Sequence, residues 1–133
     1  MLIALTLALL FFGCSHTSDV APQYEQTSKL IKENVSDDAR KKQALDIVNQ
    51  MKQTTEAAAK QAEKQNDALS KLLENQQTPS IQIEALANAK SDQDTTTAEK
   101  LLDFRFQLKS VLTETEWGKV FPPPTSAPDT QPN

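Results

Sequence analysis

The chain of 133 residues contains very few of the residue types on which most catalytic and metal sites depend. It has one cysteine, one histidine and two glycines. Because the single histidine, His16, lies close to the N-terminal apolar run, we expect no histidine-based triad and no multi-histidine metal site within one chain. With Gly13 and Gly118 alone, every glycine-rich phosphate-binding loop is excluded. We therefore expect no enzyme activity, no metal ion and no cofactor.

The composition limits the fold and the partners as well. One cysteine leaves no internal disulfide, so packing alone must stabilise the domain. Aromatic residues make up 5% of the chain, and alanine supplies much of the rest of its hydrophobic set, which favours a thin helical assembly over a deep core. The net charge is −4, and the basic residues are spread along the chain. No basic stripe is present, so we expect no nucleic-acid partner.

The N-terminal segment is the clearest sequence signal. Met1 to Phe12 is an apolar run without charge, and Gly13 and Cys14 follow it directly. Such a run is shorter than the roughly 20 residues that cross a bilayer, but it fits the hydrophobic region of a secretory signal. It resembles a bacterial lipoprotein signal, in which a small residue precedes a cysteine that is acylated and becomes the mature N-terminus.

This resemblance implies a location in the bacterial cell envelope. Residues 1–13 would be a signal peptide and residues 14–21 a linker, with lipid such as palmitate on Cys14 as the contact with the membrane. Ser15 after the cysteine usually accompanies sorting to the outer membrane, facing the periplasm. In the alternative interpretation, the segment is an ordinary cleaved signal of an exported protein and Cys14 is a free thiol.

The next part of the chain predicts two helices. Residues 22–35 have helical apolar spacing, and a break is expected near Ser36, which can cap the following helix. Residues 37–76 contain neither glycine nor proline, and they predict a helix roughly 60 Å long. Its apolar seam advances in steps of three and four, and the small and polar middle of the seam should be its softest part. The seam consists of Ala44, Val48, Met51, Thr55, Ala58, Ala62, Gln65, Leu69 and Leu72.

The return segment is predicted to contain three helices. Thr78 and Pro79 are a helix cap and first residue, and they start a helix over 79–90. A capping box or turn at 91–94 is expected to follow it. A second helix is expected over 95–112, where Leu102 and Phe106 widen the apolar face. Thr113 and Glu116 form a capping box for a short final helix that ends at Phe121. The apolar positions of the first two helices are Ile81, Ile83, Leu86, Ala89, Leu101, Phe104, Leu108 and Val111.

The outgoing and returning segments have nearly equal lengths and are joined by a short turn. This arrangement favours an all-α fold, either an elongated antiparallel helical hairpin or a small helical bundle. The helical domain is expected to cover residues 22–121. Residues 122–133 hold most of the prolines and are expected to form a disordered tail.

The aromatic residues of the helical domain are concentrated near its end. Phe104, Phe106, Trp117 and Phe121 lie close together in sequence, and Tyr24 alone lies elsewhere. In one interpretation these rings form the best core of the bundle. In the other, Trp117 and some of the phenylalanines stay accessible and bind a partner, because aromatic residues dominate binding hot spots.

Residues 112–116, Leu-Thr-Glu-Thr-Glu, are similar to the Leu-Thr-x-x-Gln motif of Spy/CpxP-type periplasmic helical proteins. The resemblance implies a bent helical hairpin that dimerises and binds unfolded or signalling partners. Glu116 stands where that family has glutamine, and the motif occurs once instead of twice. In this comparison Thr113 and Glu116 are structural capping residues rather than ligand contacts.

Two functions fit these observations. The first is a non-catalytic, lipid-anchored interaction protein of the cell envelope that acts as an accessory subunit, adaptor or holdase and binds a protein partner. The second is a structural coiled-coil spacer that forms homo-oligomers at the membrane surface. An exposed surface around Trp117 would favour the first, and a fully buried Trp117 with a continuous symmetric seam would favour the second.

Overall fold

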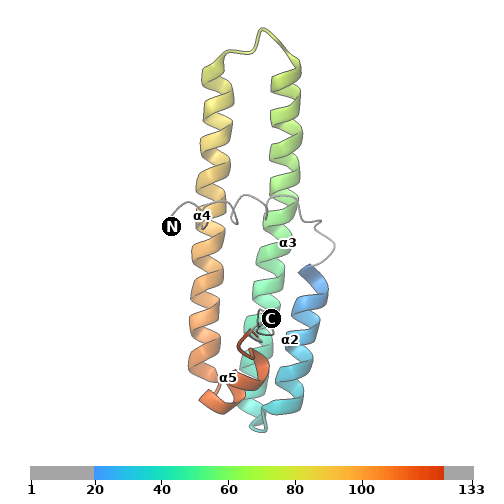
Figure 1. Ribbon diagram of the computed structural model, residues 1–133, viewed down its shortest axis with the longest axis vertical. Helices are drawn as coiled ribbons and strands as arrows, with labels where there is room; N and C mark the ends of the chain where they lie inside the picture. Colours follow the sequence, from blue (N-terminus) through green and yellow to red (C-terminus); the bar gives the residue numbers. More distant parts are fainter. Residues whose placement is uncertain (1–19, 125–133) are drawn as a thin grey trace, which may run out of the picture.

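The structure is a computed structural model that describes residues 20–124, and within this range it is all-α. Its four helices are α2 (Val20–Asn34), α3 (Asp38–Glu74), α4 (Ser80–Val111) and α5 (Glu114–Val120). α3 and α4 form a long antiparallel hairpin, α2 lies along the lower half of α3, and α5 folds across the lower end (Figure 1). The predicted elongated hairpin and the predicted small bundle are therefore combined in one molecule. The signal, Cys14 and residues 125–133 of the tail lie outside the described residues.

The break between α2 and α3 is confirmed, but the capping residue differs from the prediction. Asp37, not Ser36, is the N-cap, and its carboxylate accepts a hydrogen bond of 2.8 Å from the backbone N–H of Arg40. The negative charge of Asp37 also suits the positive end of the helix dipole. The seam predicted for α3 is confirmed as well, since every one of its members is buried or partly buried.

The predicted turn at residues 91–94 is wrong, because α4 is continuous from Ser80 to Val111. This stretch contains no glycine or proline, and its polar side chains find partners compatible with a helix. Lys90 forms an ion pair of 2.8 Å with Asp94, and the Thr96 hydroxyl donates to the carbonyl of Asp92 over 2.9 Å. Capping-type residues therefore do not end a helix where nothing else requires a bend.

After the turn between the long helices, α4 begins one residue later than predicted. Pro79, not Thr78, occupies the N-cap position, with φ −60° and ψ 137° and no side-chain cap. Asn75 organises the turn instead. Its carbonyl accepts from the N–H of Thr78 over 2.9 Å, and its side-chain oxygen accepts from the N–H of Gln77 over 3.1 Å.

The buried core lies entirely at the lower end of the molecule, which we call the base. There α2, α5 and the adjoining ends of α3 and α4 pack together, with Ile31 and Leu108 fully buried (Figure 1). Residues 60–95 form the rest of the hairpin, which we call the arm, and it projects beyond α2 as two helices. The core residues are Ile31, Val35, Ala44, Ile47, Val48, Phe104, Leu108, Leu112 and Val120.

Candidate functional site

The candidate site is built on α5, whose position follows from local sequence. α4 ends at Val111, and Thr113 starts α5 by accepting a hydrogen bond of 3.2 Å from the N–H of Glu116. The Glu116 carboxylate accepts in return from the N–H of Thr113 over 2.8 Å. The predicted capping box is therefore confirmed, and it turns the chain sharply back across the base.

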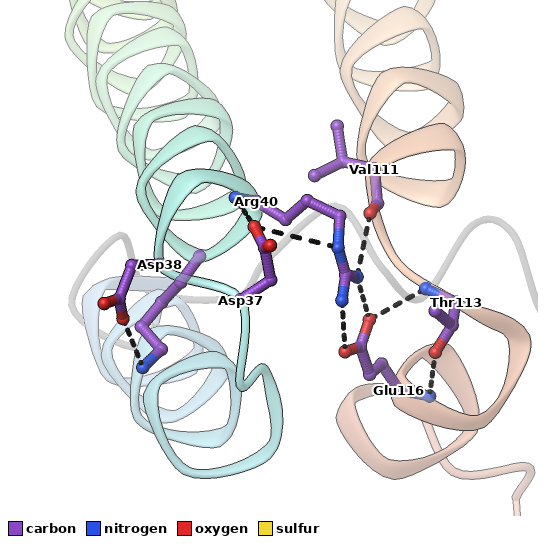
Figure 2. Close-up of polar contacts among 7 residues, drawn as sticks. Asp37, Asp38, Arg40, Val111, Thr113 and Glu116 are labelled. Atoms are coloured by element: carbon purple, nitrogen blue, oxygen red, sulfur yellow. Dashed lines mark hydrogen bonds and ion pairs between the residues drawn. The ribbon is translucent and has the colours of Figure 1, made fainter.

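An ion pair between helices fixes this short helix in place. The guanidinium of Arg40, at the start of α3, contacts both carboxylate oxygens of Glu116 at 2.5 and 3.1 Å (Figure 2). Arg40 also donates to the carbonyl of Val111 at the end of α4 over 3.4 Å. One side chain thus joins three helix ends, in the bidentate geometry that makes arginine–carboxylate pairs strong.

The ion pair changes the acidity of Glu116. The hydrogen bonds from Arg40 and from the backbone N–H of Thr113 lower the pKa of Glu116 to about 2, although burial opposes this change. Only 10% of the Glu116 side chain is exposed, whereas 34% of the Arg40 side chain is exposed. Glu116 is therefore a permanently charged structural residue, and nothing in its surroundings prepares it to act as a general acid.

The four aromatic residues separate into three environments. Phe104 is buried in the core, and Trp117 and Phe121 are partly buried and pack against that core. The rings of Trp117 and Phe121 lie with their centroids 4.5 Å apart. Phe106 is 62% exposed and does not join them. The expectation that Phe106 and Leu102 widen the buried face of the helix is therefore wrong.

Helix geometry explains the exposure of Phe106. Phe104 and Leu108 face the core, and residues two positions away from Phe104 point to nearly the opposite side of an α-helix. Leu102, 52% exposed, lies one turn before Phe106 on the same side of α4. The two side chains form an exposed apolar pair that faces away from α3.

Two cations of α4, each three residues after a member of this exposed pair, lie against the aromatic rings of α5. The Arg105 guanidinium lies 5.6 Å from the centroid of Trp117 and 5.4 Å from that of Phe121. The Lys109 ammonium lies 5.9 Å from the centroid of Trp117. These distances fall within the range of cation–π attraction. Within residues 20–124, neither cation takes part in an ion pair.

We call this continuous region the outer surface. It combines exposed apolar side chains, partly exposed rings and two basic groups, and a shallow cleft of about 360 Å³ beside Trp117 adds a recess. Its members are Leu102, Arg105, Phe106, Lys109, Trp117 and Phe121.

Sequence reasoning found the rings but missed the charged residues around them. Arg40 is 76 positions from Glu116, and no local pattern links the two. Arg105 and Lys109 were detectable in principle, because they lie four residues apart on the helix that carries Phe104. Their relation to Trp117 depends on the direction in which α5 folds back.

The described residues offer little for chemistry on a small molecule. A second cleft of about 330 Å³ lies between α2 and α3 and is lined by Tyr24, Val48 and the lysines Lys29, Lys32 and Lys52. Within residues 20–124, no group of three or more histidine, cysteine or acidic residues is placed to hold a metal ion. In the same range, no helix is long and apolar enough to cross a membrane.

Comparison of the chain with protein-family models, with curated proteins and with solved structures found no match.

Proposed function

We propose that this protein is a lipid-anchored, non-catalytic interaction protein of the bacterial cell envelope, which works as an accessory subunit, adaptor or holdase. The apolar run that ends in Gly13 and Cys14 supports the anchor and a location at the outer membrane, facing the periplasm. The partner role rests on one observation, the exposure of Phe106 on the helix whose Arg105 and Lys109 lie against the rings of α5.

The chemistry of the outer surface indicates the kind of partner. Apolar and aromatic side chains supply the contact area. Arg105 and Lys109 add positive charge, and within the described residues neither is in an ion pair, while Glu114 lines the cleft beside Lys109. A protein segment with apolar residues and flanking carboxylates complements this combination.

The anchor is tested by the intact mass of the mature protein. We expect the mature chain to begin at Cys14 and to carry acyl groups, and we expect Cys14→Ala to leave the protein in the soluble fraction. Acyl chains contribute about 0.8 kcal/mol for each buried CH₂, so two or more chains give stable attachment. An unmodified thiol on a membrane-bound protein would contradict the proposal.

The partner surface is tested with a photoreactive phenylalanine analogue at position 106 in intact envelopes. We expect a discrete adduct with a different protein, and we expect Leu102→Ser in the same chain to abolish it. Lys42→Ser, on an exposed part of α3 away from the outer surface, is the matched control and should leave the adduct unchanged. The absence of any adduct would overturn the partner role.

The alternative function, a self-associating spacer, makes a different prediction in the same experiment. It is favoured by the arm, where two long helices extend beyond α2 (Figure 1). If the adduct at position 106 contains a second copy of this chain and nothing else, the spacer is the better description. A partner of different mass supports the adaptor.

A further inference from the structure

The tip of the arm exposes large aliphatic side chains. Leu73, in the last turn of α3, is 59% exposed, and Ile81, in the first turn of α4, is 70% exposed. Residues 75–83 between and around them contain no charged residue. These two aliphatic groups and the uncharged stretch beside them give the tip an apolar character that can favour contact with an apolar surface.

The position of α2 limits what can cover the tip. α2 runs antiparallel to α3 (Figure 1). The hydroxyls of Tyr24 in α2 and Thr55 in α3 are 2.8 Å apart and set the two helices in register. At 1.5 Å for each helical residue, Val20 lies about 22 Å from the level of the tip and about 32 Å from the level of the base. The chain therefore leaves the domain closer to the tip than to the base.

The length of chain before Val20 then decides the orientation. Six peptide units separate Cys14 from Val20, and they span at most about 22 Å when fully extended. A lipid on Cys14 can thus lie level with the tip, but it cannot reach the level of the base. An orientation in which the anchored protein stands with its base on the membrane is therefore excluded.

We infer that the tip of the arm, through Leu73 and Ile81, docks on the membrane surface that holds the lipid of Cys14. This inference rests on the proposed lipid anchor. The contact is apolar, because Glu74 and Glu84, which flank the uncharged stretch, do not attract anionic headgroups, and Lys71 is the one basic residue in the last turn of α3. The outer surface then lies away from the membrane, because α5 and the base are at the end of the hairpin opposite to the tip (Figure 1).

The test uses the full mature protein in nanodiscs of phosphatidylethanolamine and phosphatidylglycerol, with one copy in each disc. A polarity-sensitive fluorophore is attached at Leu73→Cys or Ile81→Cys, and at Leu102→Cys as the control of similar exposure. We expect a blue-shifted emission and several-fold weaker quenching by iodide at both tip positions than at position 102. Equal quenching at all three positions would overturn the inference.

A second variant separates docking from a local effect of the label. With the fluorophore at position 73, Ile81→Asp should restore quenching, because a carboxylate beside the label opposes transfer of the tip into the interface. Phe106→Asp should leave the quenching unchanged. Protection at the tip that persists with Ile81→Asp would contradict membrane docking.

Tip docking and the lipid anchor can fail separately, and one further measurement distinguishes the two cases. Intact mass measured on the same sample establishes whether Cys14 carries lipid. A lipidated protein whose tip is fully quenched overturns tip docking and leaves the anchor in place, whereas a protein without lipid overturns the anchor itself. If the tip is protected only in discs that hold two copies, it binds a second copy, and membrane docking is overturned.

Discussion

The base and the arm use the same two helices in different ways. In the base, α3 and α4 present bulky side chains such as Val48 and Leu108 to two further helices, and both are almost fully buried. In the arm the same seam carries Ala62 and Gln65, which are only partly buried. The two helices therefore extend well beyond the part of the molecule that forms the core. The hairpin extends because its sequence favours helix, whereas the molecule is stabilised at one end.

The largest difference should appear when a leucine is truncated in each region. Leu108 in the base has no exposed surface, so Leu108→Ala should lower the free energy of unfolding by about 3–4 kcal/mol. Leu69 in the arm is partly buried, and Leu69→Ala should cost about 1 kcal/mol. Urea unfolding followed by the fluorescence of Trp117 measures both. Equal losses would show that the arm is packed as tightly as the base.

A smaller effect is expected from the ion pair that closes the base. Because the pKa of Glu116 is lowered from 4.5 to about 2 in the folded protein, its contribution is complete above pH 4.5 and is lost as the pH falls toward 2. Arg40 is one-third exposed and partly screened by water, so we expect Glu116→Gln to cost about 1–2 kcal/mol at pH 7.

The pH dependence distinguishes this ion pair from the cap alone. Glutamine at position 116 can keep the hydrogen bond to the backbone of Thr113, so the variant isolates the charge. The difference in unfolding free energy between wild type and Glu116→Gln, measured by urea titration, should shrink between pH 5 and pH 2. A difference that is constant across this range would show that the ion pair does not contribute to the stability of the base.

The smallest predicted effect has the opposite sign and concerns the arm. The side-chain oxygen of Gln65 is buried, and it has no hydrogen-bond partner within the described residues. Gln65→Leu removes this unsatisfied group and should stabilise the arm by about 1 kcal/mol. Hydrogen exchange should show slower exchange of the neighbouring α3 amides, with the base unchanged. Faster exchange there would mean that Gln65 has a partner, such as water.

The sequence predicted the elements of this fold better than their junctions. Spacing of apolar residues identified the seam of α3 from Ala44 to Leu72, because a helix that packs on one side must repeat every three to four residues. The capping box at Thr113 was also predictable, since it depends on two residues three positions apart. The residues at 91–94 misled the prediction, because serine and aspartate favour caps but do not prevent a helix.

The candidate site could be predicted only in part. The aromatic residues were identified from their crowding in sequence, but the exposure of Phe106 follows from which side of α4 meets α3. The link from Arg40 to Glu116 depends on the return of the chain across the base after more than 70 residues. Contacts of this kind are set by the three-dimensional arrangement, and no local pattern encodes them.

The closing of the base by α5 has a consequence for the order in which the protein forms during synthesis. The core joins residues near Ile31 and Val48 with residues near Leu112 and Val120, whereas the contacts between α3 and α4 near their turn are local. Local contacts form early, and distant ones wait for their partners. A growing chain therefore has no completed core until its last helix is made, so the base closes only when translation of the helical domain is almost finished.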